Sequence, residues 1–180
     1  MKKLSTEQVS ARFAEREAAG HHVDGRLKRR LNRDTDFYEI VFDDQDSFLS
    51  IIWQCISDVQ IVAPPGEPRD LRSVANRIVK AGWSFARLAS DPPISKGTHD
   101  PKWFDICFKI DRDFSYQDFG EIAIRPLNEH EEKSNPRGTF YIHDGNHKTL
   151  VLATKLLRQE VDFSPITALY VRPSKVETDD

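Results

Sequence analysis

Residues 139–157, TFYIHDGNHKTLVLATKLL, decide the fold of this chain. Residues 139–142 favour a β-strand, and residues 147–157 favour a helix that packs against a sheet. Gly145 stands between the two segments, where the chain must turn. The sequence therefore predicts a strand, a glycine turn and a helix in direct succession. The amino end of such a helix can bind a phosphate, because its first N–H groups have no partner inside the helix and the helix dipole is positive there.

The residues around this turn add hydrogen-bond donors and charge. Asn146, His147 and Lys148 follow Gly145 directly and would offer side-chain donors and one fixed positive charge to phosphate oxygens. Asp144 precedes the glycine. A carboxylate there repels a phosphate unless it caps the helix, orients His147, or holds a divalent cation that bridges to the phosphate. The alternative is an ordinary N-cap at Asp144, followed by a solvated histidine and lysine.

Two segments of the chain, in the same order, resemble the ParB/sulfiredoxin superfamily. IHDGNHKTLVLATKLL, followed by SPITALYV, looks like the DGxHR-type motif of that superfamily. Upstream, QIVAPPGEPRDLRSVANRIVKAG is similar to its opening box, which is a strand, a turn with proline and arginine, and a helix that ends in glycine. The resemblance covers roughly residues 59–171, and residues 83–120 align with nothing. It implies an α/β fold, a ParB/sulfiredoxin-like mixed sheet with surrounding helices.

The resemblance also implies a ligand, since known members bind ATP or CTP at the glycine turn. The phosphates would then contact Gly145, Asn146, His147 and Lys148. Lys148 stands where arginine is usual, which keeps the charge but loses the bidentate fork. Arg69 resembles the arginine of the opening box, which lies near the phosphates; the alternative is a solvated turn residue paired with its neighbouring aspartate.

The catalytic residues expected at this site are Asp144, His147 and Glu67. Asp144 would hold Mg²⁺ jointly with the nucleotide phosphates, or orient His147. His143 and His147 could instead form a metal site with Asp144, but the alternation of side chains along a strand points His143 away from Asp144. A phosphoryl-transfer reaction needs a carboxylate as base, which Glu67 could supply.

Departures from the family pattern narrow the function. Asn146 occupies the place of the reactive cysteine of sulfiredoxins, so sulfinic-acid reduction is not expected. Few residues follow Val171, so the DNA-binding domain of chromosome-partitioning members is not expected either. The size is closest to small stand-alone members such as the Osa-type plasmid fertility-inhibition proteins, which resemble minimal copies of the fold with ATPase and DNase activity.

The leading hypothesis is therefore a nucleotide-binding phosphohydrolase, an ATPase, which could also act as a metal-dependent DNase in plasmid conjugation or fertility inhibition. The first alternative is a non-catalytic inhibitor that binds a partner protein, such as a conjugation or secretion ATPase, and uses nucleotide as a switch. The second is a kinase of the free-serine type. The carboxylates that could serve such a kinase as base are Glu67, Glu129, Glu131 and Glu132.

The chain has one dense basic stretch, HHVDGRLKRRLNRD, within residues 21–34. It could contact a nucleic-acid backbone, or it could be a solvated helix face without aromatic residues for base stacking. The net charge of −3 and the pI of about 6.1 argue against a protein that coats nucleic acid over its whole surface. The candidate nucleic-acid contacts are Arg26, Lys28, Arg29, Arg30 and Arg33.

The remaining pattern predicts the organisation of the chain. Residues 1–34 form a loosely attached helical and basic arm, residues 35–173 form the ParB/sulfiredoxin-like domain, and residues 174–180 form a disordered tail. No apolar run is long enough to span a membrane and the start lacks a secretory signal, so we expect a cytoplasmic protein. Cys55 and Cys107 are expected to be buried free thiols. Helices are predicted at residues 5–19, 48–56 and 71–81, and further strands at 37–42, 59–62, 106–110, 121–125 and 166–171.

Overall fold

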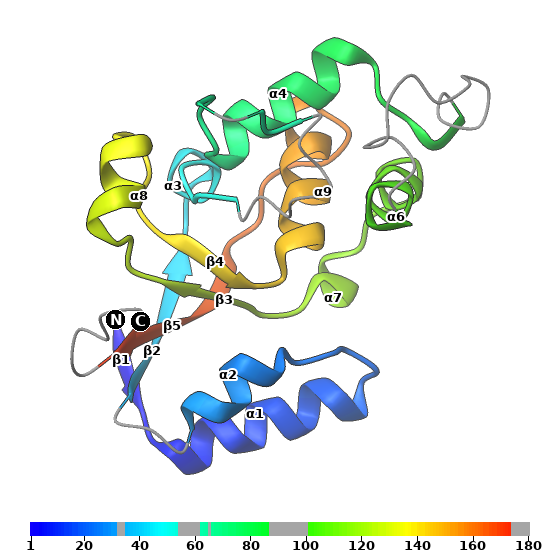
Figure 1. Cartoon of the computed structure of the whole chain (residues 1–180). Coiled ribbons are helices and arrows are strands. Elements are labelled where there is room, and N and C mark those ends of the chain that lie inside the picture. The colour runs from blue at the N-terminus through cyan, green and yellow to red at the C-terminus, as the bar shows by residue number, and fades with distance from the viewer. Residues whose placement is uncertain (32–34, 54–61, 65, 87–100, 174–180) are drawn as a thin grey trace.

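The structure is a computed structural model that describes residues 1–31, 35–53, 62–64, 66–86 and 101–173 (Figure 1). It is a mixed α/β fold built on one five-stranded sheet. The strands are β1 (Lys2–Leu4), β2 (Thr35–Phe42), β3 (Ile122–Arg125), β4 (Tyr141–Asp144) and β5 (Ile166–Pro173). The helices are α1 (Thr6–Ala18), α2 (Gly25–Arg30), α3 (Gln45–Leu49), α4 (Leu71–Ala81), α6 (Pro101–Ile110), α7 (Tyr116–Phe119), α8 (Glu129–Ser134) and α9 (Asn146–Leu157).

The strand order in the sheet is β1-β2-β5-β3-β4. β3 and β5 run parallel, and the other neighbouring pairs are antiparallel. α1 and α2 lie on one face of the sheet, and α3, α4 and α9 lie on the other (Figure 1). Helix α9 packs against both α4 and α6. The turn from β4 into α9 therefore lies at the edge of the sheet, between the two layers of helices.

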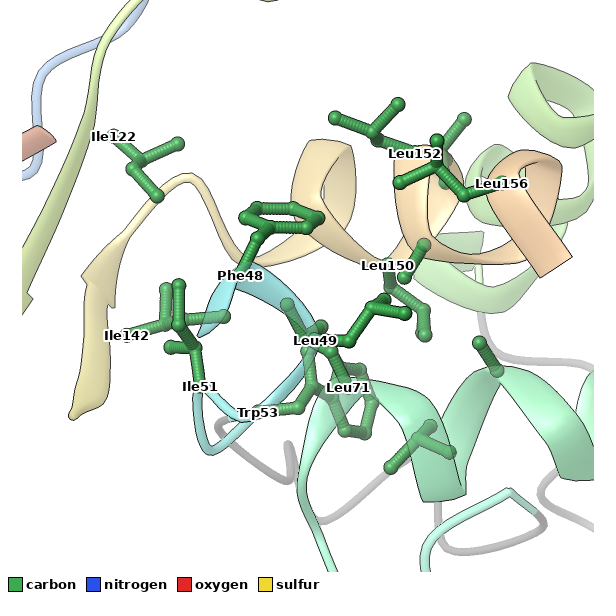
Figure 2. Packing of buried hydrophobic residues seen from close by; sticks show 14 of the residues in the cluster. Phe48, Leu49, Ile51, Trp53, Leu71, Ile122, Ile142, Leu150, Leu152 and Leu156 are labelled. Atoms are coloured by element: carbon green, nitrogen blue, oxygen red, sulfur yellow. The ribbon is translucent and has the colours of Figure 1, made fainter. Parts of the chain in front are cut away.

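Each face of the sheet has its own core. Ile122 and Ile124 of β3 belong to the core on the α9 side, while Ala123 between them belongs to the core on the α1 side, as strand alternation requires. Figure 2 shows the first core, where Phe48, Leu49 and Trp53 lie near Leu150 of α9. The second core contains Leu4, Val9, Phe13, Val23, Leu27, Phe37, Ala123, Leu169 and Val171.

This second core corrects the prediction of a loosely attached arm. β1 pairs with β2 in the sheet, and Val9 and Phe13 of α1 are almost fully buried against it. Burying these side chains contributes on the order of 1.5–3 kcal/mol each, so α1 is part of the folded body.

Local sequence signals account for the elements that were predicted. Ser5 and Gln8 form the expected capping box of α1. Asp70 caps α4 through the N–H of Ser73, and Gly82 ends that helix in the left-handed conformation. The strands expected at 37–42, 121–125 and 166–171 correspond to β2, β3 and β5.

Two predicted elements are wrong. The helix expected at residues 48–56 ends at Leu49 as α3, and Ile52 instead forms bridges to Asp70 and to Tyr141. The strand expected at residues 106–110 is the carboxyl half of α6. Ile106, Cys107 and Ile110 lie on one buried helical face, a spacing that a five-residue apolar run does not distinguish from a strand.

Several other predictions fall partly or wholly outside the described residues. Cys107 is a buried free thiol, as predicted, whereas Cys55 lies outside the described residues. So do Arg33, the tail at 174–180, and all of the strand expected at 59–62 except Val62, which lies in a turn. Within the described residues, no helix combines the length and the apolar character needed to cross a bilayer.

Candidate functional site

The predicted succession of strand, glycine turn and helix is confirmed as β4, Gly145 and α9, although the strand spans Tyr141–Asp144 and so lies two residues later than the expected 139–142. Gly145 is the N-cap of α9 and has φ 92° and ψ 20°, a left-handed conformation that favours glycine. A Cβ atom at this position would lie 2.8 Å from Cε of Lys148 and 3.0 Å from Cγ2 of Ile122. Both the backbone and the space around it therefore require glycine.

Asp144 has partners on both carboxylate oxygens. Its Oδ1 accepts the N–H of Gly145 at 2.8 Å, and its Oδ2 accepts Nη2 of Arg16 from α1 at 2.7 Å. The two side chains are only 15% and 10% exposed, so this is a largely buried ion pair. Gly145, and not Asp144, is the N-cap of α9. The Asp144 carboxylate pairs with Arg16 instead of capping the helix.

Arg16 was missed at the sequence level. It lies 128 positions from Asp144, and no local pattern joins the two. One signal was present, because Arg16 follows Phe13 by three residues and Val9 by seven, on the buried stripe of α1. A charged residue on such a stripe needs a buried partner.

Lys148 folds back onto the turn before β3. Its Nζ donates to the carbonyl oxygens of Phe119 at 2.6 Å and Glu121 at 2.7 Å, and lies 5.2 Å from the centre of the Phe119 ring. Burial, with a smaller contribution from the charge of Arg16, lowers the pKa of Lys148 to about 8. The ammonium group of Lys148 thus makes two hydrogen bonds within the protein. These bonds hold the turn at Gly120 beside Gly145.

The ion pairs continue along α1 as a charged layer on the sheet. Arg12, one turn before Arg16, contacts Glu39 of β2 and lies 2.6 Å from Glu121. Burial raises the pKa of Glu121, and the charge of Arg12 opposes this shift. With Asp144 and Lys148, the layer contains three basic and three acidic side chains, so their formal charges cancel.

His147 and Asn146 lie on the first turn of α9. Nδ1 of His147 is 3.4 Å from Oδ2 of Asp105 on α6, a carboxylate that sequence reasoning did not connect with the site. The carbonyl oxygen of Asn146 accepts the indole N–H of Trp53 at 3.0 Å. Trp53 is fully buried, so this bond fixes the first turn of α9 against the core.

Arg69 is joined to the same tryptophan. Its carbonyl oxygen accepts the backbone N–H of Trp53 at 2.8 Å, and its own N–H donates to Oδ1 of Asn135 at 3.0 Å. Trp53 therefore bonds to Arg69 through its backbone and to Asn146 through its indole. The Asp70 carboxylate accepts both the N–H and the hydroxyl of Ser73, so helix capping occupies it.

Other candidates lie on separate elements. The Glu67 carboxylate is 3.8 Å from Arg77 of α4 and lines a cavity of about 450 Å³ there. On α2, Lys28 pairs with Glu17, while Arg26 and Arg29 are exposed. Burial lowers the pKa of His143, and the charge of the half-buried Arg30 adds to this shift.

A magnesium ion at Asp144 would compete with the Arg16 guanidinium for the carboxylate. Among the residues that the structure describes, no three histidine, cysteine or acidic side chains are grouped closely enough to hold a metal. Because both of its oxygens already have partners, Asp144 in this arrangement does not fit a direct magnesium ligand.

Comparison with protein-family models, curated proteins and solved structures finds no match.

Proposed function

We propose that the amino end of α9 binds the phosphates of a nucleotide, ATP or CTP, and that the protein hydrolyses the terminal phosphate. The observation that carries the proposal is the double attachment of Trp53. The backbone N–H of this buried residue donates to the Arg69 carbonyl oxygen at 2.8 Å, and its indole N–H donates to the first turn of α9 at 3.0 Å. A phosphate between them would receive charge from Arg69 on one side and helix N–H groups on the other.

The succession of β4, Gly145 and α9 on a mixed sheet supports a ParB/sulfiredoxin-like fold for the domain. The chemistry of hydrolysis falls to His147. Asp105 lies close to Nδ1, which favours the tautomer with a proton on Nδ1 and leaves Nε2 as the base. Nε2 would take a proton from water as the water oxygen attacks the terminal phosphorus. The bridging P–O bond breaks, and the nucleoside diphosphate leaves.

Calorimetry with ATP, CTP and GTP, with and without Mg²⁺, tests the binding step. Arg69→Ala should weaken binding at least tenfold. Arg72→Ala, three residues along, is the matched control, because Arg72 pairs with Asp46 and should leave affinity unchanged. Absence of nucleotide binding by the wild type, or equal binding by Arg69→Ala, would contradict the proposal.

Turnover separates the enzyme from its alternatives. His147→Ala should keep much of the affinity and lower kcat by about 10²–10⁴-fold, the usual contribution of a general base. A nucleotide-switched inhibitor of a partner protein would bind nucleotide without releasing phosphate. A kinase of the free-serine type would yield a phosphorylated hydroxyl compound instead of free phosphate.

Contact with DNA is a second candidate function, favoured by the exposed basic side chains of α2. Leu27 is fully buried and anchors this short helix, while Arg26 and Arg29 remain exposed. Removing one arginine that binds a DNA phosphate should reduce the salt dependence of log K by about 1. Removing both arginines should therefore lower the slope for a DNA duplex by about 2, and an unchanged slope would exclude α2 from the interface with DNA.

A further inference from the structure

Helix α1 presents two arginines to the sheet, one turn apart, and they have different partners. Arg12 contacts Glu39 and Glu121. Arg16 donates to Oδ2 of Asp144 at 2.7 Å and reaches the carbonyl oxygen of His22 only at 3.5 Å. Both arginines dock α1, but only Arg16 contacts the strand that leads into the candidate site.

Arg16 is buried, so its guanidinium group needs the Asp144 carboxylate as a counter-ion. The residue is 9% exposed, and its Nε and Nη1 have no hydrogen-bond partner among the described residues. A buried guanidinium without a counter-ion is strongly unfavourable, so docking of α1 requires the Asp144 carboxylate to face Arg16. The other oxygen of that carboxylate then accepts the N–H of Gly145. A continuous contact thus runs from α1 through Asp144 to the first turn of α9.

The negative charge of Asp144 affects how an anionic ligand binds beside it. An unpaired carboxylate next to Gly145 would repel a phosphate at the amino end of α9. Arg16 neutralises that carboxylate and holds it in one orientation. The turn is therefore compatible with a phosphate while α1 is docked.

We propose that Arg16 is a positioning residue that couples the docking of α1 to ligand binding at the amino end of α9. The proposal rests on the proposed phosphate site. The pair of Arg16 and Asp144 acts as an ionic latch, and loss of the latch both loosens the first turn of α9 and exposes negative charge to the phosphate. Binding and docking are reciprocal, so nucleotide should stabilise α1 in place.

Hydrogen exchange on the protein without ligand tests the latch independently of any nucleotide. Arg16→Met and Arg12→Met each remove one arginine from the same face of α1 and keep an apolar stem. We expect the amides of Gly145 and Thr149, which donate to the Asp144 carboxylate and to the Gly145 carbonyl oxygen, to exchange at least tenfold faster in Arg16→Met than in Arg12→Met. Equal exchange at these amides in the two variants would overturn the latch.

Affinity for ATP tests the coupling. Arg16→Met should weaken binding at least tenfold relative to Arg12→Met. Adding Asp144→Asn should restore much of the loss, because asparagine keeps an acceptor for the Gly145 N–H and removes the repelling charge. A double variant no better than Arg16→Met overturns the electrostatic coupling. A wild type that binds no nucleotide defeats the proposed function, and the exchange measurement then still decides whether Arg16 positions the turn.

Discussion

Gly145→Ala should destabilise the protein far more than the same change at another glycine of similar backbone conformation. Gly145 has φ 92°, and alanine in the left-handed region costs roughly 1–2 kcal/mol. The new Cβ would also lie 2.8 Å from Cε of Lys148 and 3.0 Å from Cγ2 of Ile122. Overpacking of this kind costs about 1–3 kcal/mol, and Lys148 cannot move aside without breaking its bonds to two carbonyl groups.

Gly20 is the matched control. It has φ 80°, and a Cβ there would meet nothing within 4 Å, so Gly20→Ala contains only the backbone cost of roughly 1–2 kcal/mol. Urea unfolding at equal protein concentration should place the midpoint of Gly145→Ala below that of Gly20→Ala by about 1 M, given an m-value of about 2 kcal/mol/M. Equal midpoints for the two variants would refute the crowding at the turn, and with it the tight approach of Lys148 to Gly145.

Three further outcomes follow from buried polar groups. Burial lowers the pKa of Lys148 to about 8 from 10.5, so the unfolded chain holds that proton more tightly and this residue adds stability as the pH rises from 8 to 10.5. In urea titrations across that range, Lys148→Met should lack this gain, and a parallel pH dependence in both proteins would contradict the shift. Burial raises the pKa of Cys107 to about 12, so native Cys107 should alkylate at pH 8 only as fast as the protein opens; peptide mass spectrometry showing the rate of a free thiol would oppose this. Asn135→Ala should cost about 1–3 kcal/mol in urea unfolding, because the Arg69 N–H loses its acceptor and the Glu131 carbonyl oxygen loses a donor; an unchanged midpoint would count against these bonds.

Elements with local signals could be predicted from the sequence, and elements fixed by distant contacts could not. The caps Asp70 and Gly82 bracket α4 within a dozen residues, and both act as the sequence indicates. The turn at Gly145 is equally local. Residues 51–53, in contrast, are not helical, because the N–H of Ile52 donates to the carbonyl oxygen of Phe140, nearly ninety positions away. Local helix propensity contains no information about such a distant hydrogen bond.

The same distinction divides the candidate site. Residues 144–148 were found from their order in the chain, but the partners that set their roles come from elsewhere. Arg16 approaches from α1 and Asp105 from α6, and neither contact leaves a signal near the turn. Arg69 was singled out by its place in the opening box, and its link to α9 depends on Trp53 in a segment predicted to be helical.

Lys148 shows how these partners change the meaning of a mutation. By type and position it is the natural phosphate ligand, and its removal is the obvious test of the site. Its ammonium group, however, binds two carbonyl oxygens before β3, and its stem covers Gly145. Weaker binding by Lys148→Ala would therefore follow equally from removal of a phosphate ligand and from a collapsed turn. Arg69 and His147 are the better probes. Arg69 is held through its backbone, and the His147 side chain keeps more than a quarter of its surface exposed. We therefore expect replacement of either side chain to disturb the turn less than replacement of Lys148.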